Sequence, residues 1–199
     1  MQQNDSYAPN ADKLRSVEKF KMIPGRTLVI GPSRAGKSFF AEALKTAGLN
    51  VIDADKDTDL MKWRSDITGE TVIKPLHTDD TWLANNHFTI KPNELREFLD
   101  RQGDVIVFAH CWNIMDVLGE FDHAAYMELP AQELERRLQV ERSDHTGVGS
   151  TSELEFFRQR HLERSHQAKE RSIPFVDATL KPAQFYDQLS TALHSGTKY

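Results

Sequence analysis

The sequence lacks several features that would assign it to a large class of proteins. It holds a single cysteine, Cys111, so no disulfide can form within the chain. Its N-terminus does not show the basic-then-apolar pattern of a secretory signal, and no apolar run approaches the roughly 18 residues of a membrane-spanning helix. We therefore expect a soluble, cytoplasmic protein with no membrane partner.

A basic charge balance is also missing. The chain carries 25 Lys and Arg against 30 Asp and Glu, which gives a net charge of -5 and a pI near 5.9. An extended nucleic-acid surface normally needs a basic footprint that displaces phosphate counterions, so this balance argues against one. With 199 residues and 39% hydrophobic content, we expect one globular domain, present as a monomer or homodimer.

What the sequence does contain is the Walker A pattern GxxxxGK[ST], which reads GPSRAGKS at residues 31–38. An apolar, β-branched run at residues 27–30 precedes it and predicts a buried strand. Phe40 and Leu44 follow at helical spacing, and Gly48 is placed to end that helix. This strand–loop–helix setting turns backbone N–H groups and a helix N-terminus toward phosphates, so it predicts a bound nucleoside triphosphate.

The pattern also predicts roles for individual residues. We expect Lys37 to bridge the β- and γ-phosphate oxygens and the Ser38 hydroxyl to coordinate Mg²⁺. The other nucleotide contacts expected from this loop are Gly31, Ser33, Arg34, Ala35, Gly36 and Phe39. The loop does not identify the reaction, because GTPases, motor ATPases and small-molecule kinases all use it.

Four further strands are predicted from apolar runs, and helical patterns alternate with them. The strands lie near residues 51–52, 105–109, 125–129 and 174–176, and the helices near 92–103, 130–138, 152–171 and 182–193. This alternation predicts an α/β fold of the three-layer P-loop NTPase type, with a five-stranded parallel sheet and helices on both faces.

The domain organisation follows from the segments that lack these patterns. Residues 1–22 are predicted to form an N-terminal extension, and residues 23–199 the P-loop domain. Two polar segments with little regular pattern interrupt that domain. We interpret them as a substrate-binding insertion at about residues 57–86 and a lid at about residues 142–151.

Two carboxylates follow the second predicted strand. Mg²⁺ prefers oxygen ligands, and the strand ending at residue 109 offers only His110 and Cys111, so we assign the metal to Asp53. Alternation in an extended segment points Asp55 to the same side, where it can accept the proton of a substrate hydroxyl. Asp55 is thus the predicted base. The alternative is that Asp55 caps the next helix.

Together with the 31–38 loop, these residues resemble the small P-loop kinases, which include shikimate kinase, gluconate kinase and nucleoside monophosphate kinases. The shikimate kinase type shares the loop, an Asp-x-Asp after the second strand, and a following Gly-Glu, here Gly69-Glu70. The chain differs at residues 110–113, where the shikimate enzymes have a glycine-rich turn, and Lys74 is the nearest cation where they have an arginine. The resemblance implies ATP-dependent, Mg²⁺-assisted phosphoryl transfer to a small metabolite, nucleoside or nucleotide.

The resemblance also implies a lid that brings arginines over the transferred group. Arginines flank the lid on both sides, namely Arg136, Arg137 and Arg142 before it and Arg158, Arg160 and Arg164 after it. By resemblance Arg142 touches the nucleotide, and Arg158 or Arg160 approaches the transferred phosphate. We assign Arg142 and Arg158 to catalysis. The alternative for any single arginine is pairing with a neighbouring glutamate.

Two other functions share parts of this pattern. A polynucleotide 5'-hydroxyl kinase uses the same loop and an Asp after the second strand, but it needs a basic groove. A non-enzymatic nucleotide sensor needs the loop but not the Asp pair. The base-reading pattern Asn-Lys-x-Asp of GTPases is absent, which favours ATP. Trp63, Trp82 and Trp112 lie in or beside the expected substrate region, either to stack on a flat substrate or to pack in the core.

Overall fold

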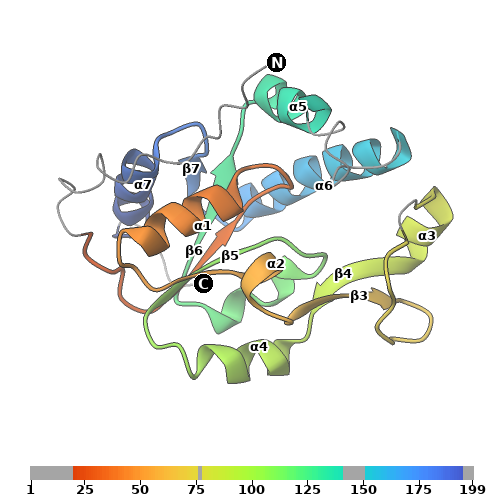
Figure 1. Cartoon of the computed structure of the whole chain (residues 1–199), viewed down its shortest axis with the longest axis horizontal. Helices are drawn as coiled ribbons and strands as arrows, with labels where there is room; N and C mark the ends of the chain where they lie inside the picture. Colours follow the sequence, from red (N-terminus) through yellow and green to blue (C-terminus); the bar gives the residue numbers. More distant parts are fainter. Residues whose placement is uncertain (1–19, 76–77, 141–150, 195–199) are drawn as a thin grey trace, which may run out of the picture.

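The computed structural model describes residues 20–75, 78–140 and 151–194, and a five-stranded parallel sheet lies at its centre (Figure 1). Its strand order is β2-β5-β1-β6-β7. The strands are β1 (Arg26–Ile30), β2 (Val51–Asp53), β5 (Val105–Ala109), β6 (His123–Glu128) and β7 (Phe175–Asp177). The predicted parallel sheet is confirmed, and β1, which leads into the 31–38 loop, is its middle strand.

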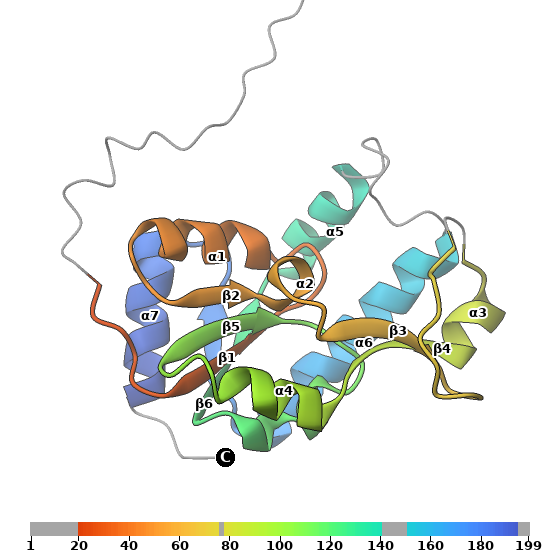
Figure 2. The same cartoon turned by 60° about the horizontal axis from the view of Figure 1, so that its bottom comes forward.

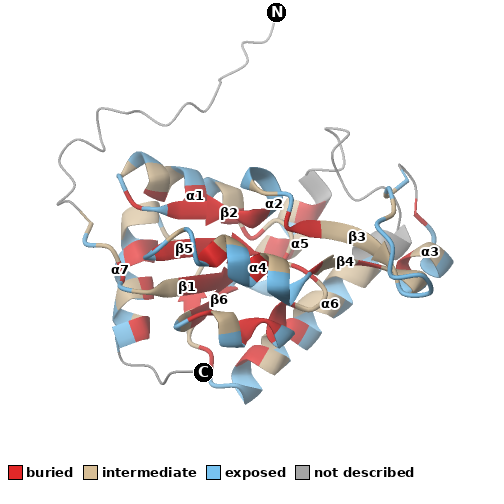
Figure 3. Cartoon of the chain, turned by 90° about the horizontal axis from the view of Figure 1, so that it is seen from below, coloured by how far each residue is buried: buried red, intermediate tan, exposed pale blue. Residues whose placement is uncertain are grey.

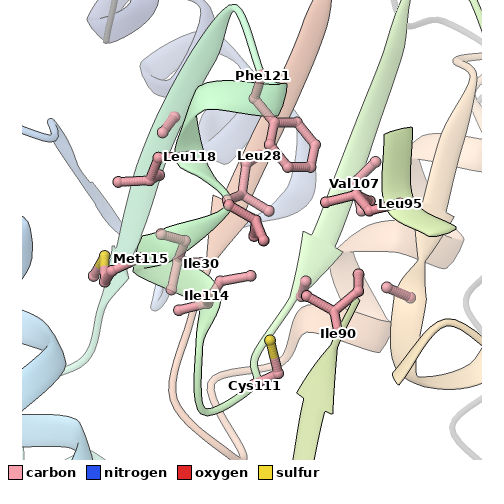
Figure 4. Packing of buried hydrophobic residues seen from close by; sticks show 14 of the residues in the cluster. Leu28, Ile30, Ile90, Leu95, Val107, Cys111, Ile114, Met115, Leu118 and Phe121 are labelled. Atoms are coloured by element: carbon pink, nitrogen blue, oxygen red, sulfur yellow. The ribbon is translucent and has the colours of Figure 1, made fainter. Parts of the chain in front are cut away.

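Helices cover both faces of the sheet, because successive side chains along each strand point to opposite sides. Leu28 and Val107 face a core formed with α4 (Pro92–Leu99) and α6 (Thr151–Glu170); Figure 4 shows side chains of this core. Val29 faces a second core, formed with α1 (Lys37–Thr46), α5 (Ala131–Val140) and α7 (Pro182–His194). Figure 1 shows α1 and α4 on opposite sides of the strands, which confirms the three-layer prediction.

Glycine and proline set the helix ends where the sequence predicts them. Gly36 precedes α1 with φ of 96°, and Gly48 follows it with φ of 90°, both in the left-handed region that favours glycine. Pro92 and Pro182 are the first residues of α4 and α7, where a missing N–H leaves no helical hydrogen bond unmade.

The segment expected to be irregular contains a β-hairpin. β3 (Met61–Ser65) pairs antiparallel with β4 (Asn86–Ile90); α2 (Ala54–Asp57) precedes the hairpin, and α3 (Asp80–Asn85) lies in the connection between its strands. Met61 and Ile90 are buried in the core that the sheet forms with α4 and α6. Figure 2 shows the hairpin projecting from the sheet beside α6. The expectation of little regular structure is wrong here, because two short strands separated by about twenty residues show their pattern only once their register is known.

Residues become less buried from the central sheet toward the far end of the β3–β4 hairpin. Figure 3 shows the strands of the sheet mostly buried, whereas three of the six residues of α3 are exposed and only Leu83 is buried. At the opposite side of the molecule, the Phe20 ring lies 4.7 Å from the Tyr186 ring of α7, and the Tyr186 hydroxyl donates to the Lys21 carbonyl oxygen. The chain is therefore anchored to α7 just before β1.

Parts of the predicted domain organisation lie outside the described residues. These are residues 1–19 of the expected N-terminal extension and residues 142–150 of the expected lid. Within the described ranges, no helix combines the length and the apolar character that crossing a membrane requires.

Candidate active site

The 31–38 loop joins β1 to α1 in a tight turn. The Ala35 amide donates to the Pro32 carbonyl oxygen at 3.2 Å, which closes the turn. A Cβ at Gly31 would lie 3.0 Å from the sulfur and 3.1 Å from the Cβ of Met127, so any larger residue would be crowded against β6 at this point. The sequence therefore determines this loop locally, through glycines that allow its close approach to β6 and its left-handed step into the helix.

Lys37, the first residue of α1, folds back over the loop. Its side chain is buried, and Nζ donates to the carbonyl oxygens of Gly31 and Pro32, both at 3.3 Å. The same nitrogen lies 3.9 Å from Oδ2 of Asp55. Burial lowers the pKa of Lys37, and the carboxylates of Asp55 and Asp53 oppose that change. The tertiary structure thus brings together the loop lysine and the predicted base.

The two aspartates after β2 occupy different environments. Asp53 is 2% exposed, and its Oδ1 accepts a hydrogen bond from the Asp55 amide at 3.2 Å, which makes Asp53 the N-cap of α2. The expectation of an extended Asp53–Asp55 segment is wrong, because α2 begins at Ala54. The alternative that Asp55 caps the next helix is wrong as well. Asp55 instead faces Lys37, and burial raises the pKa of its carboxyl group.

One buried oxygen of this pair has no partner among the described residues. Oδ2 of Asp53 is inaccessible to solvent and makes no hydrogen bond to any of them. Buried polar atoms normally have a partner, and Mg²⁺ is commonly held by one or two carboxylates together with waters and substrate phosphates. Asp53 at the end of β2 and Ser38 in the first turn of α1 provide oxygen donors of the kind that Mg²⁺ prefers, so these residues fit a magnesium ion.

A pocket of about 310 Å³ opens beside the loop. Ser33 of the loop and Asp55 lie in its wall, together with His110 and Cys111, which follow β5. Its volume is at the lower end of the range for small-molecule sites. The predicted base therefore borders both the loop lysine and a space for a second molecule.

The two residues after β5 differ in what they offer to this pocket. Burial and the nearby charges of Lys37 and Arg164 hold the pKa of His110 well below 6.5, so its imidazole is neutral. Its Nδ1 is buried and has no hydrogen-bond partner in the described part of the chain. Burial raises the pKa of the Cys111 thiol to about 12, so this thiol is not a nucleophile near neutral pH. Of these two residues, His110 has the unused hydrogen-bonding capacity.

Aromatic rings form much of the remaining wall, and all of them come from the hairpin, the 110–113 turn or α6. They are Trp63, Phe88, Trp112, Phe156 and Phe157. The Trp112 ring lies 3.4 Å from the ring of His87, and the Cζ atom of Arg160 lies 3.2 Å from the centre of Trp112. Trp63 and Trp112 therefore line the pocket while they contact neighbouring side chains. Sequence analysis did not identify His87, because its position on β4 depends on the hairpin register.

Four of the six arginines predicted to flank the lid separate into three groups. Arg142 lies outside the described residues. Arg158 lies on the exposed side of α6, where it forms ion pairs with Glu135 and Glu155 and does not line the pocket. Arg160 and Arg164, one turn apart on α6, do line it. The catalytic roles assigned to Arg142 and Arg158 stay predictions.

Arg137 of α5 contacts the loop directly, which sequence analysis did not predict. Its Nη1 donates to the carbonyl oxygens of Arg34 at 3.3 Å and Ala35 at 3.1 Å. Its Nε donates to Glu133 at 2.8 Å, which fixes the guanidinium in this position. The only sequence signal is the i, i+4 spacing of Glu133 and Arg137. Arg137 thus holds two loop carbonyl groups and stabilises the loop conformation.

Substituting Arg137 with alanine is expected to weaken ATP binding about tenfold, because charged hydrogen bonds that order the loop contribute roughly 1.5 kcal/mol. Calorimetric titration with ATP and Mg²⁺ measures this. Arg136→Ala is the matched control, since Arg136 pairs with the same Glu133 from an exposed position, and its described hydrogen bonds go to that glutamate and not to the loop. Equal affinities for the two variants would contradict a role of Arg137 in ordering the loop.

Comparisons with known proteins support the fold. No protein-family model matches the chain, and no curated protein sequence matches it significantly. Among solved structures, the chain is similar to a gluconokinase from Sinorhizobium meliloti 1021, with 18% identity, a TM-score of 0.51 and coverage of 87% of this chain and 94% of that one. A sugar kinase from Janibacter sp. HTCC2649 has 20% identity, a TM-score of 0.47 and coverage of 85% and 94%. Thymidylate kinase from Candida albicans has 16% identity, a TM-score of 0.47 and coverage of 85% and 91%. All three are named as kinases, and the likeness to the gluconokinase shows a shared fold.

Proposed function

We propose that this protein transfers the γ-phosphoryl group of ATP to a hydroxyl group of a small molecule held in the 310 Å³ pocket. One observation carries the proposal. Asp55 lies 3.9 Å from the loop lysine, Lys37, and also lines the pocket, so a base is placed between a phosphate-binding loop and an acceptor space. A simple nucleotide-binding site has no need of this arrangement.

The chain's own residues divide the chemistry between donor and acceptor. Asp55 accepts the proton of the acceptor hydroxyl, the hydroxyl oxygen forms a bond to the γ-phosphorus, and the bond from that phosphorus to the β–γ bridging oxygen breaks. ADP leaves with the electron pair of that bond. Neutral His110 lines the pocket without adding charge to it. A raised pKa makes the Asp55 carboxylate a better proton acceptor.

The 31–38 loop provides the binding site for the phosphoryl donor, ATP. Lys37 exchanges its hydrogen bonds to the Gly31 and Pro32 carbonyl groups for phosphate oxygens, while Ser38 and Asp53 are the residues that would hold Mg²⁺. Bound there, Mg²⁺ would neutralise charge that develops on the phosphate oxygens.

The pocket favours a kinase with a small acceptor over the polynucleotide kinase and over the non-enzymatic nucleotide sensor. A volume of about 310 Å³ suits one metabolite, whereas a polynucleotide kinase needs an open basic groove along its substrate. A sensor that only binds nucleotide has no use for an acceptor pocket beside its loop.

The test is a screen for acceptor-dependent ADP release. The full-length protein with ATP and Mg²⁺ is incubated with hydroxylated metabolites, nucleosides and nucleotides, and in parallel with a 5'-hydroxyl oligonucleotide. We expect stimulation by at least one small molecule and none by the oligonucleotide. ATP binding without stimulation by any compound would favour the sensor, and stimulation by the oligonucleotide alone would favour the polynucleotide kinase.

A further inference from the structure

The turn that follows β5, at residues 110–113, is hydrogen-bonded to the outer edge of β4. The Trp112 amide donates to the Phe88 carbonyl oxygen at 2.6 Å. The Asn113 side chain bonds to both main-chain groups of Ile90. Its Oδ1 accepts from the Ile90 amide at 3.0 Å, and its Nδ2 donates to the Ile90 carbonyl oxygen at 2.8 Å. These bonds join the β3–β4 hairpin to the end of β5.

Asn113 takes the place of a neighbouring strand at this edge. The edge of a sheet presents main-chain donors and acceptors that need partners, and an asparagine side chain offers both kinds of group, as a peptide does. Its Oδ1 also accepts from the Cys111 thiol at 3.5 Å. The shikimate kinase type, which the sequence resembles, has a glycine-rich turn here, and glycine has no side chain for such bonds. The clamp that Asn113 forms on Ile90 is therefore a feature of this chain.

The Asn113–Ile90 clamp joins two sets of residues that line the pocket. The hairpin contributes Trp63, His87 and Phe88, and the turn contributes His110, Cys111 and Trp112. Met61 and Ile90 also pack in the core, but apolar burial is non-directional, whereas hydrogen bonds constrain both distance and angle. The clamp thus sets how the hairpin wall lies relative to the turn wall.

The wall formed by α6 meets the same turn. The Cζ atom of Arg160 lies 3.2 Å from the centre of the Trp112 ring, and Arg164 donates to the Trp112 carbonyl oxygen. The ring of His87, on β4, stacks on Trp112 at 3.4 Å. A displacement of the hairpin would therefore disturb the contacts that hold the α6 wall as well.

We propose that Asn113 is a positioning residue, which fixes the hairpin wall through Ile90 and so determines where the acceptor lies. Asn113 itself is not among the described residues that line the pocket. The role toward an acceptor rests on the proposed function, whereas the clamp does not. Because a misplacement of about 1 Å can cost a catalysed reaction roughly a hundredfold in rate, loosening one wall is sufficient to lower turnover.

Hydrogen exchange tests the clamp without any acceptor. In full-length Asn113→Ala, the Ile90 and Trp112 amides should each lose about tenfold in protection, the effect of one missing hydrogen bond. The Val72 amide donates to the Trp63 carbonyl oxygen at 2.9 Å on the far edge of β3, and it should keep its protection. Unchanged protection at Ile90 would overturn the proposal. Lost protection at all three amides would also overturn it, since Asn113 would then hold the hairpin folded rather than in position.

Steady-state kinetics test the positioning of the acceptor. Asn113→Ala is expected to raise the acceptor KM and to lower acceptor kcat/KM by about tenfold or more, with the ATP KM unchanged. Asn50→Ala is the matched control, because the Asn50 amide donates to the carbonyl oxygens of Gln102 at 3.1 Å and Asp104 at 2.9 Å, outside the described pocket lining. Equal losses in the two variants, or normal acceptor kinetics in Asn113→Ala, would overturn the proposal.

Asn113→Asp takes the place of Asn113→Ala if the alanine variant does not fold. At neutral pH its carboxylate keeps an oxygen for the Ile90 amide but has no donor for the Ile90 carbonyl oxygen, so both measurements should change in the same direction. The two proposals fail separately. Lost protection at Ile90 without phosphorylation of any acceptor would reject phosphoryl transfer and leave the clamp standing. Turnover by the wild type, with unchanged exchange and kinetics in the Asn113 variants, would do the reverse.

Discussion

Replacing Lys37 with alanine is expected to lower acceptor-dependent ADP release by about a thousandfold or more, because a preorganised charge on the transferring group is lost. The Nζ atom of Lys37 donates to the Gly31 and Pro32 carbonyl oxygens, so the lysine already lies over the phosphate-binding turn. Steady-state kinetics with ATP and the acceptor found in the screen measure the effect. Near-normal turnover of this variant would contradict the proposed function.

The fold is expected to survive this substitution. Burial lowers the pKa of Lys37 in the folded state, so at neutral pH the charged lysine costs stability, and this cost diminishes only as the pH rises through the lowered pKa toward 10.5. Removing the ammonium lifts that cost and offsets part of the lost packing. Lys37→Met, which keeps the stem, is the matched control. Both variants should unfold within a few degrees of the wild type and should be equally inactive.

Asp55→Asn is expected to lower kcat by roughly 10² to 10⁴-fold, the usual contribution of a positioned proton acceptor, and to change ATP affinity only a few-fold. The pH profile gives the sharper test. The wild-type rate should fall as the pH drops through a pKa above 3.8, since the raised pKa belongs to the group that must be ionised. The residual rate of the variant should lack this acidic limb. An unchanged limb would assign the proton acceptor to another residue.

The Asp55→Asn substitution should lower activity without lowering the stability of the fold. A carboxyl group with a raised folded-state pKa contributes stability below its unfolded pKa and loses that contribution as the pH rises through the folded pKa. At neutral pH the ionised Asp55 therefore destabilises the fold, and the neutral asparagine removes this cost. Thermal unfolding of Asp55→Asn should occur at the wild-type temperature or above it. A clear loss of stability would show that the contact of Asp55 with Lys37 outweighs desolvation.

The sheet could be predicted from the sequence because its strands are continuous apolar runs with helical patterns between them. Residues 105–109 are buried without exception, as strands covered on both faces must be. The β3–β4 hairpin could not be predicted in the same way. Its strands mix apolar and polar residues, and pairing Trp63 with Phe88 requires a register that the intervening residues do not reveal.

The candidate site shows the same division. Asp53 and Asp55 could be proposed as metal ligand and base from their position after a strand, but strand alternation was the wrong reason for Asp55, since a helical turn aims it at Lys37. The resemblance assigned Arg158 or Arg160 to the transferred phosphate, and the helical pattern of α6 does not reveal which of its arginines are buried. Contact between α6 and the 110–113 turn decides that, through the hydrogen bond from Arg164 to Trp112.

The sequence by itself determined the 31–38 loop, its strand and its helix, because glycine conformations, apolar runs and helix spacing act between residues that are neighbours in the chain. Only the tertiary structure decided that Arg137 holds the loop, that Lys37 meets Asp55, and that a pocket lined by the buried Arg164 lies beside them. Those contacts join residues that are distant in sequence, and their burial and electrostatics exist only after the sheet has brought the segments together.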